Sequence, residues 1–265
     1  MKRVLVAMVS TLLLAACTSA ANHSALVTTP TLKPDEAAPA AYGGTQLNAS
    51  VPNSILSLKF FNQENHSFTL RDYAGKTVVI TNFLTHCQDA GPLIATNFLA
   101  ISKSVEKSSL SDDVVFMLIT VDAARDSAER LKAYGEVFGF PGNVILASAS
   151  PESLGSLWKY FGVPSAFHEL SPDEIATFPN DWQTGLAPSR HYMYTNMVSV
   201  IDANSTWRWV QTGHPEIENN PMPKRMMDFL SPDGRGLLNK KDDFGWRVIQ
   251  VKLAIADVTG VEIPK

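Results

Sequence analysis

GKTVVITNFLTHCQDAGP, from Gly75 to Pro92, is the stretch that decides the fold. Its first half is a run of β-branched and apolar residues, which is typical of a strand buried on both faces of a sheet. The run leads directly into Cys87, and Pro92 suits the first turn of a helix continuing to Val105. The segment therefore predicts a strand, a cysteine-bearing loop and a helix in direct succession.

The same alternation of strand and helix continues after this segment. Val114 to Val121 is a second buried strand, and Asp126 is placed to cap a following helix with Glu129 completing a capping box. Strands that alternate with helices favour a largely parallel sheet covered on both faces. The other expected elements are strands at Ile55–Phe61, Ser67–Leu70 and Asn143–Ala147, a helix at Ser153–Phe161, a long loop or insertion at 165–190, a hairpin of Met193–Ile201 with Thr206–Gln211, and a closing helix at Phe244–Val258.

The N-terminus has the layout of an export signal. Lys2 and Arg3 precede an apolar run that is short for a permanent membrane helix, and the run ends in Leu-Ala-Ala followed by Cys17. This ending resembles the bacterial lipobox, which implies cleavage before Cys17 and lipidation of its sulfur. Residues 18–50 are rich in Ala, Thr, Ser, Pro and Asn. We therefore expect a signal peptide at 1–16, a lipidated N-terminus and flexible linker at 17–50, and one globular domain at 51–260.

Composition excludes several classes of function. The chain has 265 residues, a formal net charge of −4 and no basic stripe, which argues against a nucleic-acid partner. It also lacks a Ser-His-Asp order, a phosphate-binding loop, zinc-ligand spacing and paired carboxylates. The sequence leaves enzymatic activity undecided and favours a protein that is not a classical enzyme.

Cys87 is the best candidate for chemistry, as a redox thiol. With Cys17 assigned to the lipid, it has no partner cysteine, and Gly91 stands where a second thiol four residues on would be. A following helix would lower the pKa of the thiol through its N-terminal dipole. Such a thiolate can form a sulfenic acid or a mixed disulfide but cannot complete dithiol exchange alone. An inert buried cysteine is the alternative.

Three motifs in order are similar to the SCO/SenC family of thioredoxin-fold, membrane-tethered proteins. They are the run from Gly75 to Cys87, the pair Gly91-Pro92, and the string Thr120-Val121-Asp122-Ala123-Ala124-Arg125-Asp126-Ser127 with Leu131 and Tyr134. The resemblance covers residues 53–163 well and 192–258 loosely. It implies a thioredoxin-like α/β fold with an N-terminal β-hairpin and an insertion before the final strands, and a role in delivering copper to cytochrome c oxidase or in handling thiols.

The family pattern holds copper with a Cys-x-x-x-Cys-Pro loop and a distal histidine, a soft donor set that suits Cu(I). Here the first cysteine matches Cys87 and the proline matches Pro92, but Gly91 replaces the second cysteine. The histidine position falls on or near Tyr194. Two of the three implied ligands are therefore absent from this sequence.

A copper site could still be rebuilt from Cys87 with His191, Met193 and Met197, because imidazole and thioether are acceptable Cu(I) ligands. His86, beside Cys87, is a further candidate. The alternatives are ordinary ones: strand methionines usually pack in a core, and loop histidines usually face solvent. If Tyr194 alone faces the Cys87 sulfur, copper is disfavoured. No other cofactor is expected.

Together these features lead us to expect a lipid-anchored, periplasm-facing accessory protein, at either the inner or the outer membrane. It would handle copper or assist cytochrome c oxidase assembly through Cys87, with an oxidase subunit or another envelope protein as partner. Two alternatives remain open. One is a single-cysteine thiol redox or peroxide-reactive protein. The other is a non-catalytic interaction module that binds a partner through the 165–190 insertion and exposed aromatics near Trp182.

Overall fold

Strand β5 (Thr77–Phe83) lies at the centre of a nine-stranded mixed sheet in the computed structural model, which describes residues 37–241 and 245–264. All seven β5 residues are buried, as the apolar run predicted. Strands β6 (Val114–Thr120) and β7 (Val144–Ala149) follow in parallel. The strand order is β1-β2-β11-β10-β5-β6-β7-β3-β4, with β1 (Ala37–Pro39), β2 (Thr45–Ser50), β3 (Phe60–Asn62), β4 (Ser67–Phe68), β10 (Met197–Ile201) and β11 (Thr206–Thr212).

Two small ribbons lie outside this sheet. Strand β8 (Ser165–Glu169) pairs with β9 (Arg190–Tyr194) in an antiparallel ribbon, and β12 (Pro215–Glu216) pairs with β13 (Trp246–Arg247). The helices are α1 (Asn53–Leu56), α2 (Ala90–Glu106), α3 (Ala128–Phe138), α4 (Pro151–Tyr160), α5 (Pro172–Ile175), α6 (Lys224–Phe229), α7 (Pro232–Leu237) and α8 (Val248–Thr259), with a 3₁₀ turn at Leu70–Tyr73.

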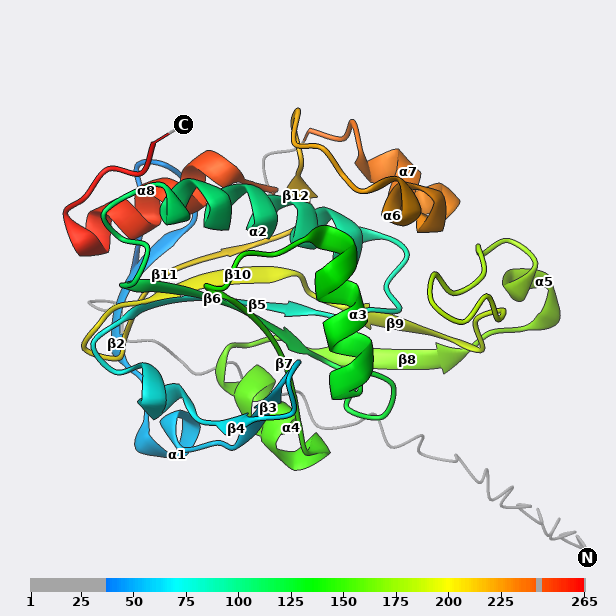
Figure 1. Cartoon of the computed structure of the whole chain (residues 1–265), viewed down its shortest axis with the longest axis horizontal. Coiled ribbons are helices and arrows are strands. Elements are labelled where there is room, and N and C mark those ends of the chain that lie inside the picture. Colours follow the sequence, from blue (N-terminus) through cyan, green and yellow to red (C-terminus); the bar gives the residue numbers. More distant parts are fainter. Residues whose placement is uncertain (1–36, 242–244, 265) are drawn as a thin grey trace, which may run out of the picture.

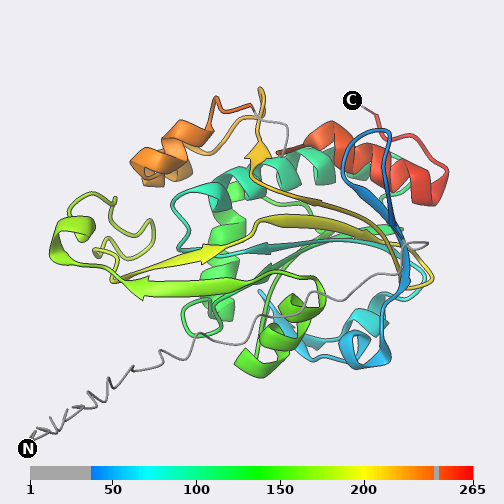
Figure 2. The ribbon, with the colours of Figure 1, turned by 180° about the vertical axis from the view of Figure 1, so that it is seen from behind.

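Helices cover both faces of the sheet. Successive β5 side chains point to opposite sides, so both faces carry apolar residues that must be buried. Val79 and Phe83 pack into a core beneath α2, α3 and α8, whereas Val78 and Ile80 pack toward α1 and α4. Figures 1 and 2 show these two helical layers from opposite sides, with the β8–β9 ribbon and α5 extending beyond the sheet. This arrangement confirms the thioredoxin-like α/β fold with an N-terminal hairpin, β3–β4, and an insertion before the final strands.

Several expectations about the elements are wrong. The sheet is mixed rather than largely parallel, because only β5, β6 and β7 run in parallel and the remaining strands return through antiparallel pairs. Residues 53–56 form helix α1 after Pro52, so the strand expected at Ile55–Phe61 does not begin at Ile55. Helix α3 is capped by the Ser127 side chain, not by Asp126. Helices α6 and α7 occupy a stretch for which the sequence analysis predicted no element.

The flexible-linker prediction also fails for residues 37–50. This segment forms the β1–β2 hairpin, and β2 pairs with β11 at the sheet edge, where Leu47 is buried. Its polar composition concealed a strand whose backbone groups are satisfied by the neighbouring strand. The predicted signal peptide, Cys17 and the first part of the linker lie outside the described residues, as does Phe244 of the closing helix. Within 37–241 and 245–264, no helix combines the length and apolar character that a membrane crossing requires.

Candidate functional site

The loop from Leu84 to Asp89 connects the carboxyl end of β5 to the start of α2. Cys87 donates its backbone N–H to the Leu84 carbonyl at 3.0 Å, which closes a tight turn before the helix. The Gly91 N–H, in the first turn of α2, points back to the Cys87 sulfur at 3.2 Å. The thiol therefore lies at the helix N-terminus, as the sequence predicted.

The pKa of Cys87 is nevertheless raised. Burial of the thiol is the main cause and the negative charge of Asp89 adds to it, while contacts from the Tyr194 hydroxyl and from the Asp89 and Gly91 backbone N–H groups act in the opposite direction. Although Cys87 as a whole residue is only partly buried, its sulfur is enclosed. The predicted lowering by the helix dipole is therefore outweighed, because the desolvation of a thiolate costs more than two N–H contacts return.

Tyr194, at the end of β9, is the residue that faces the thiol. Burial raises the pKa of its hydroxyl well above the usual value, and Cys87 is the next cause. The oxygen is enclosed and has no well-formed hydrogen bond among the described residues, so its contact with the thiol has loose geometry. The Tyr134 hydroxyl, which also senses Cys87, is enclosed in the same way. Two enclosed phenols thus belong to the surroundings of the sulfur.

Gly91 is tightly packed against the cysteine. A Cβ built at this position would lie 2.7 Å from the Cys87 Cβ and 3.3 Å from its Sγ. A disulfide needs its two Cβ atoms about 3.8 Å apart. The loop has therefore closed to a geometry that excludes a second cysteine without a shift of the backbone.

His191 is paired with a carboxylate. Its Nε2 lies 3.4 Å from an Asp89 carboxylate oxygen, and the Ser231 hydroxyl donates to the same side chain. The Asp89 contact raises the pKa of His191. Burial raises the pKa of Asp89, but hydrogen bonds from His191 and Ser231 outweigh it and hold this pKa below its usual value. The predicted ligand His191 thus reaches the Cys87 loop through Asp89.

The two methionines are not gathered at the thiol. Met193 is 54% exposed on β9. Met197 is buried in the core on the α4 side of the sheet, where its sulfur accepts a hydrogen bond from the Ser199 hydroxyl. His86 turns to the insertion, with its Nδ1 3.4 Å from an Asp181 oxygen. Burial, then Arg130 and Arg125, lower the pKa of His86 to about 4.

These residues do not fit a copper ion of the family type. Its raised pKa keeps the thiol in the neutral form and a phenol faces it. The His191 imidazole is paired with Asp89. Within the described ranges, no three His, Cys, Asp or Glu side chains form a group that could hold a metal. The sequence analysis expected copper to be disfavoured if Tyr194 faces the Cys87 sulfur, and Tyr194 does face it.

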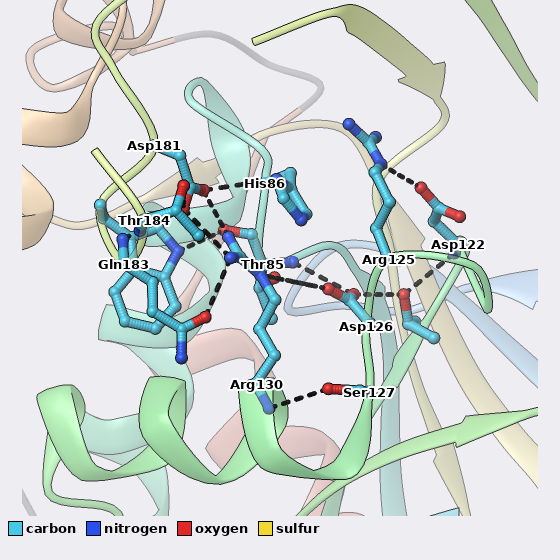
Figure 3. Close-up of polar contacts among 12 residues, drawn as sticks. Thr85, His86, Asp122, Arg125, Asp126, Ser127, Arg130, Asp181, Gln183 and Thr184 are labelled. Atoms are coloured by element: carbon cyan, nitrogen blue, oxygen red, sulfur yellow. Dashed lines mark hydrogen bonds and ion pairs between the residues drawn. The ribbon is translucent and has the colours of Figure 1, made fainter. Parts of the chain in front are cut away.

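The insertion is anchored beside Cys87 by a buried ion pair that sequence reasoning missed (Figure 3). Arg130 of α3 forms two parallel hydrogen bonds with Asp181, and its Nε donates to the Thr85 hydroxyl. Thr85 also donates to the buried Asp126, which accepts from Thr120 as well. Asp126 therefore organises the cysteine loop instead of capping α3. Arg130 follows Asp126 by four residues, but nothing in the sequence links it to a residue 51 positions on.

Trp182 is buried, with 7% exposure, so the exposed aromatics expected near it do not include Trp182 itself. Its ring lies under the Arg130 guanidinium and its indole N–H donates to the Thr85 carbonyl. Next to these contacts lies a cavity of about 230 Å³ that reaches Cys87. Its walls come from the cysteine loop, the insertion and β9, with Arg125 from the loop before α3 and Phe229 from α6. They include Leu84, Leu170, Phe178, Leu186, Asp89 and His191.

Comparison with known proteins gives one family match. Residues 53–177 match the model of the SCO1/SenC family. The matched stretch includes Cys87 and Arg130 but ends before Asp181 and Tyr194. No curated protein sequence matches the chain. Similar solved structures include a SCO1/SenC family lipoprotein from Bacillus anthracis, at 23% identity over 69% of this chain and 95% of that one, with a TM-score of 0.49. ScoI with copper bound from Arabidopsis thaliana is 16% identical over 74% of this chain and 96% of that one, with a TM-score of 0.47. ScoI with copper bound from Bradyrhizobium japonicum is 16% identical over 68% of this chain and 97% of that one, with a TM-score of 0.46.

Proposed function

The chain is a divergent member of the SCO1/SenC family, and from this premise we propose that it is an accessory protein of the cell envelope that holds a partner protein. The partner belongs to copper handling or to cytochrome c oxidase assembly, the processes that the family resemblance implies. The lipobox-like ending at Cys17 supports a lipid-anchored, periplasm-facing location. In this proposal the protein does not itself carry copper on Cys87.

One observation carries the choice between a copper carrier and a partner-binding protein. At the Cys87 thiol, a glycine packed too closely for a second cysteine and a tyrosine hydroxyl take the places where the family pattern has a thiolate and an imidazole. Cu(I) prefers soft thiolate, thioether and imidazole donors, whereas a neutral phenol is a poor ligand. The scaffold that supports the loop is retained, but its donor set is not.

The cavity beside Cys87 supports a role in binding. Its lining combines apolar side chains with polar and charged ones, among them Asp89, Arg125 and Arg190, and such a combination can hold and orient a bound group. Leu186, at 68% exposure, lies at its rim, and Phe167, at 50%, lies on the adjoining ribbon. Exposed aromatic side chains next to a pocket are typical anchors for a partner. A thiol redox role has less support, because the raised pKa of Cys87 reduces its thiolate fraction.

The copper part of this proposal is tested by native mass spectrometry after Cu(I) loading. We expect the wild type and Cys87→Ala to bind the same amount of copper. The double variant Gly91→Cys with Tyr194→His restores the family donors, although its loop backbone must shift to admit the second cysteine. Where this variant folds, it should gain one equivalent of copper that is lost again on adding Cys87→Ala. One equivalent on the wild type that disappears in Cys87→Ala would refute the proposal.

The partner-binding part is tested in cells that lack the protein. Cytochrome c oxidase activity in their membranes should fall, and both the wild type and Cys87→Ala should restore it. A chain in which 170–189 is replaced by a short Gly-Ser linker should not restore activity although it accumulates normally. If Cys87→Ala fails to restore activity, the function depends on the Cys87 thiol and the proposal is wrong.

A further inference from the structure

The insertion between β8 and β9 lies over Cys87 as a discrete segment, which we call the cover (residues 170–189). It leaves the fold at the end of β8 and returns at the start of β9, so both of its ends lie on one narrow ribbon. In Figure 1 the cover extends past the sheet, away from the helical layers. Its residues Leu170, Phe178 and Leu186 form one wall of the cavity that reaches Cys87. Access to the thiol from that side therefore depends on where the cover lies.

The cover is attached to the domain at a small group of contacts centred on Asp181. Both carboxylate oxygens of Asp181 accept hydrogen bonds from Arg130, whose side chain is 7% exposed. The adjacent Trp182 donates to the Thr85 carbonyl, and Gln88 donates to the Pro179 carbonyl at 2.6 Å. A buried ion pair depends strongly on both partners, because either charge alone would be left without compensation.

The contacts inside the cover are different, because most are local and solvent-exposed. Helix α5 has a single turn, none of its residues is buried, and its Ser171–Glu174 capping box involves only neighbours. The turn 181–186 is held by Asp181 itself, which accepts from Thr184, and Gly185 has a φ of +71° with open space around it. Segments that depend on few buried contacts open at low free-energy cost. Pro179, Asp181 and Trp182 are thus where the domain holds the cover, and Arg225 adds a hydrogen bond to the Trp182 carbonyl.

We infer that the cover is a lid over Cys87 that opens and closes, and that the Arg130–Asp181 pair is the latch that keeps it closed. The same arginine binds Thr85, two residues before the cysteine, so closure of the lid and position of the thiol loop are linked through one guanidinium. In the closed form the thiol is shielded from large molecules. Release of the latch exposes Cys87 and the cavity together. This inference concerns access and holds whether or not the cavity binds a partner.

The test compares the modification rate of Cys87 by a small reagent, iodoacetamide, and by a bulky one, polyethylene-glycol maleimide, on the folded full chain. A parallel Cys87→Ala sample corrects for Cys17. Asp181→Asn, which keeps the side-chain size, should raise the bulky-reagent rate by roughly tenfold or more and the iodoacetamide rate by less. Asp173→Asn makes the same chemical change at an exposed site of the cover and should match the wild type. Circular dichroism confirms that each variant is folded.

A second variant keeps the inference testable if Asp181→Asn does not fold. Trp182→Phe retains an aromatic ring against Tyr134 but removes the hydrogen bond to the Thr85 carbonyl. It should raise the bulky-reagent rate severalfold. A folded Asp181→Asn or Trp182→Phe protein whose bulky-reagent rate equals that of Asp173→Asn would overturn the inference.

Discussion

The Tyr194 hydroxyl lies against the Cys87 thiol, on or near the position for which the family resemblance implies a metal-ligating histidine. Both groups are enclosed, and each changes the protonation of the other. A phenol in this position is a weak donor that stabilises a thiolate slightly, and it is a poor ligand for copper. The pair therefore explains how a retained cysteine loop can lose its metal chemistry.

Removing this hydroxyl should make the cysteine less reactive. In Tyr194→Phe one of the three contacts that lower the pKa of Cys87 is lost, whereas burial and the Asp89 charge, which raise it, remain. We expect the pKa of Cys87 to rise further, so that alkylation at pH 8 slows. The measurement is the iodoacetamide rate against pH for both proteins. An unchanged pH profile would show that the hydroxyl does not interact with the sulfur.

Gly91 should be intolerant of any side chain. Because a Cβ there would lie 2.7 Å from the Cys87 Cβ, Gly91→Ala should lower the free energy of unfolding by about 1–3 kcal/mol through overpacking. Gly155→Ala in α4, with nothing within 4 Å of the added atom, is the matched control and should raise it by about 0.5–1 kcal/mol. Urea unfolding measures both. Equal effects would show that the loop relaxes freely.

The His191–Asp89 pair should stabilise the fold only over a window of pH. Because the pKa of His191 is raised in the folded protein, the pair contributes fully to the free energy of unfolding below about pH 6.5. This contribution is lost as the pH rises through the pKa that His191 has in the folded protein. The lowered pKa of Asp89 gives stability that is present above about pH 3.8 and is lost on further acidification. His191→Gln should therefore reduce the free energy of unfolding more at pH 5.5 than at pH 8.5. Both side chains are partly exposed, so we expect less than about 1 kcal/mol. An equal loss at both pH values would contradict the assignment.

His86 should act in the opposite sense. Its pKa is lowered to about 4 by burial and by Arg130 and Arg125, so the unfolded chain binds a proton that the folded chain does not bind until the pH is lower. Stability should fall as the pH drops from about 6.5 to 4. His86→Gln, which cannot be protonated, should flatten this part of the curve of unfolding free energy against pH. An acid limb as steep as that of the wild type would assign the loss to other groups.

Much of the architecture could be predicted because it follows from patterns among residues close together in the sequence. The apolar runs of β5 and β6, the turn at 202–205 between β10 and β11, and the helices α2 and α4 each follow from patterns within about fifteen residues. The β1–β2 hairpin could not be predicted in this way. Its strands are polar, and they are ordered only by the edge of a sheet whose nearest strand, β11, lies far along the chain.

By itself, the sequence determined a strand, a loop with one cysteine and a helix in succession, and a glycine where a second cysteine would be. These are properties of covalent order and local periodicity, and the family resemblance added the thioredoxin-like fold. Only the tertiary structure decided that Tyr194 faces the thiol, that His191 pairs with Asp89, and that Arg130 holds the cover through Asp181. Such pairs join residues from 51 to 107 positions apart. Because their energies arise from burial and charge in a shared interior, no local pattern records them.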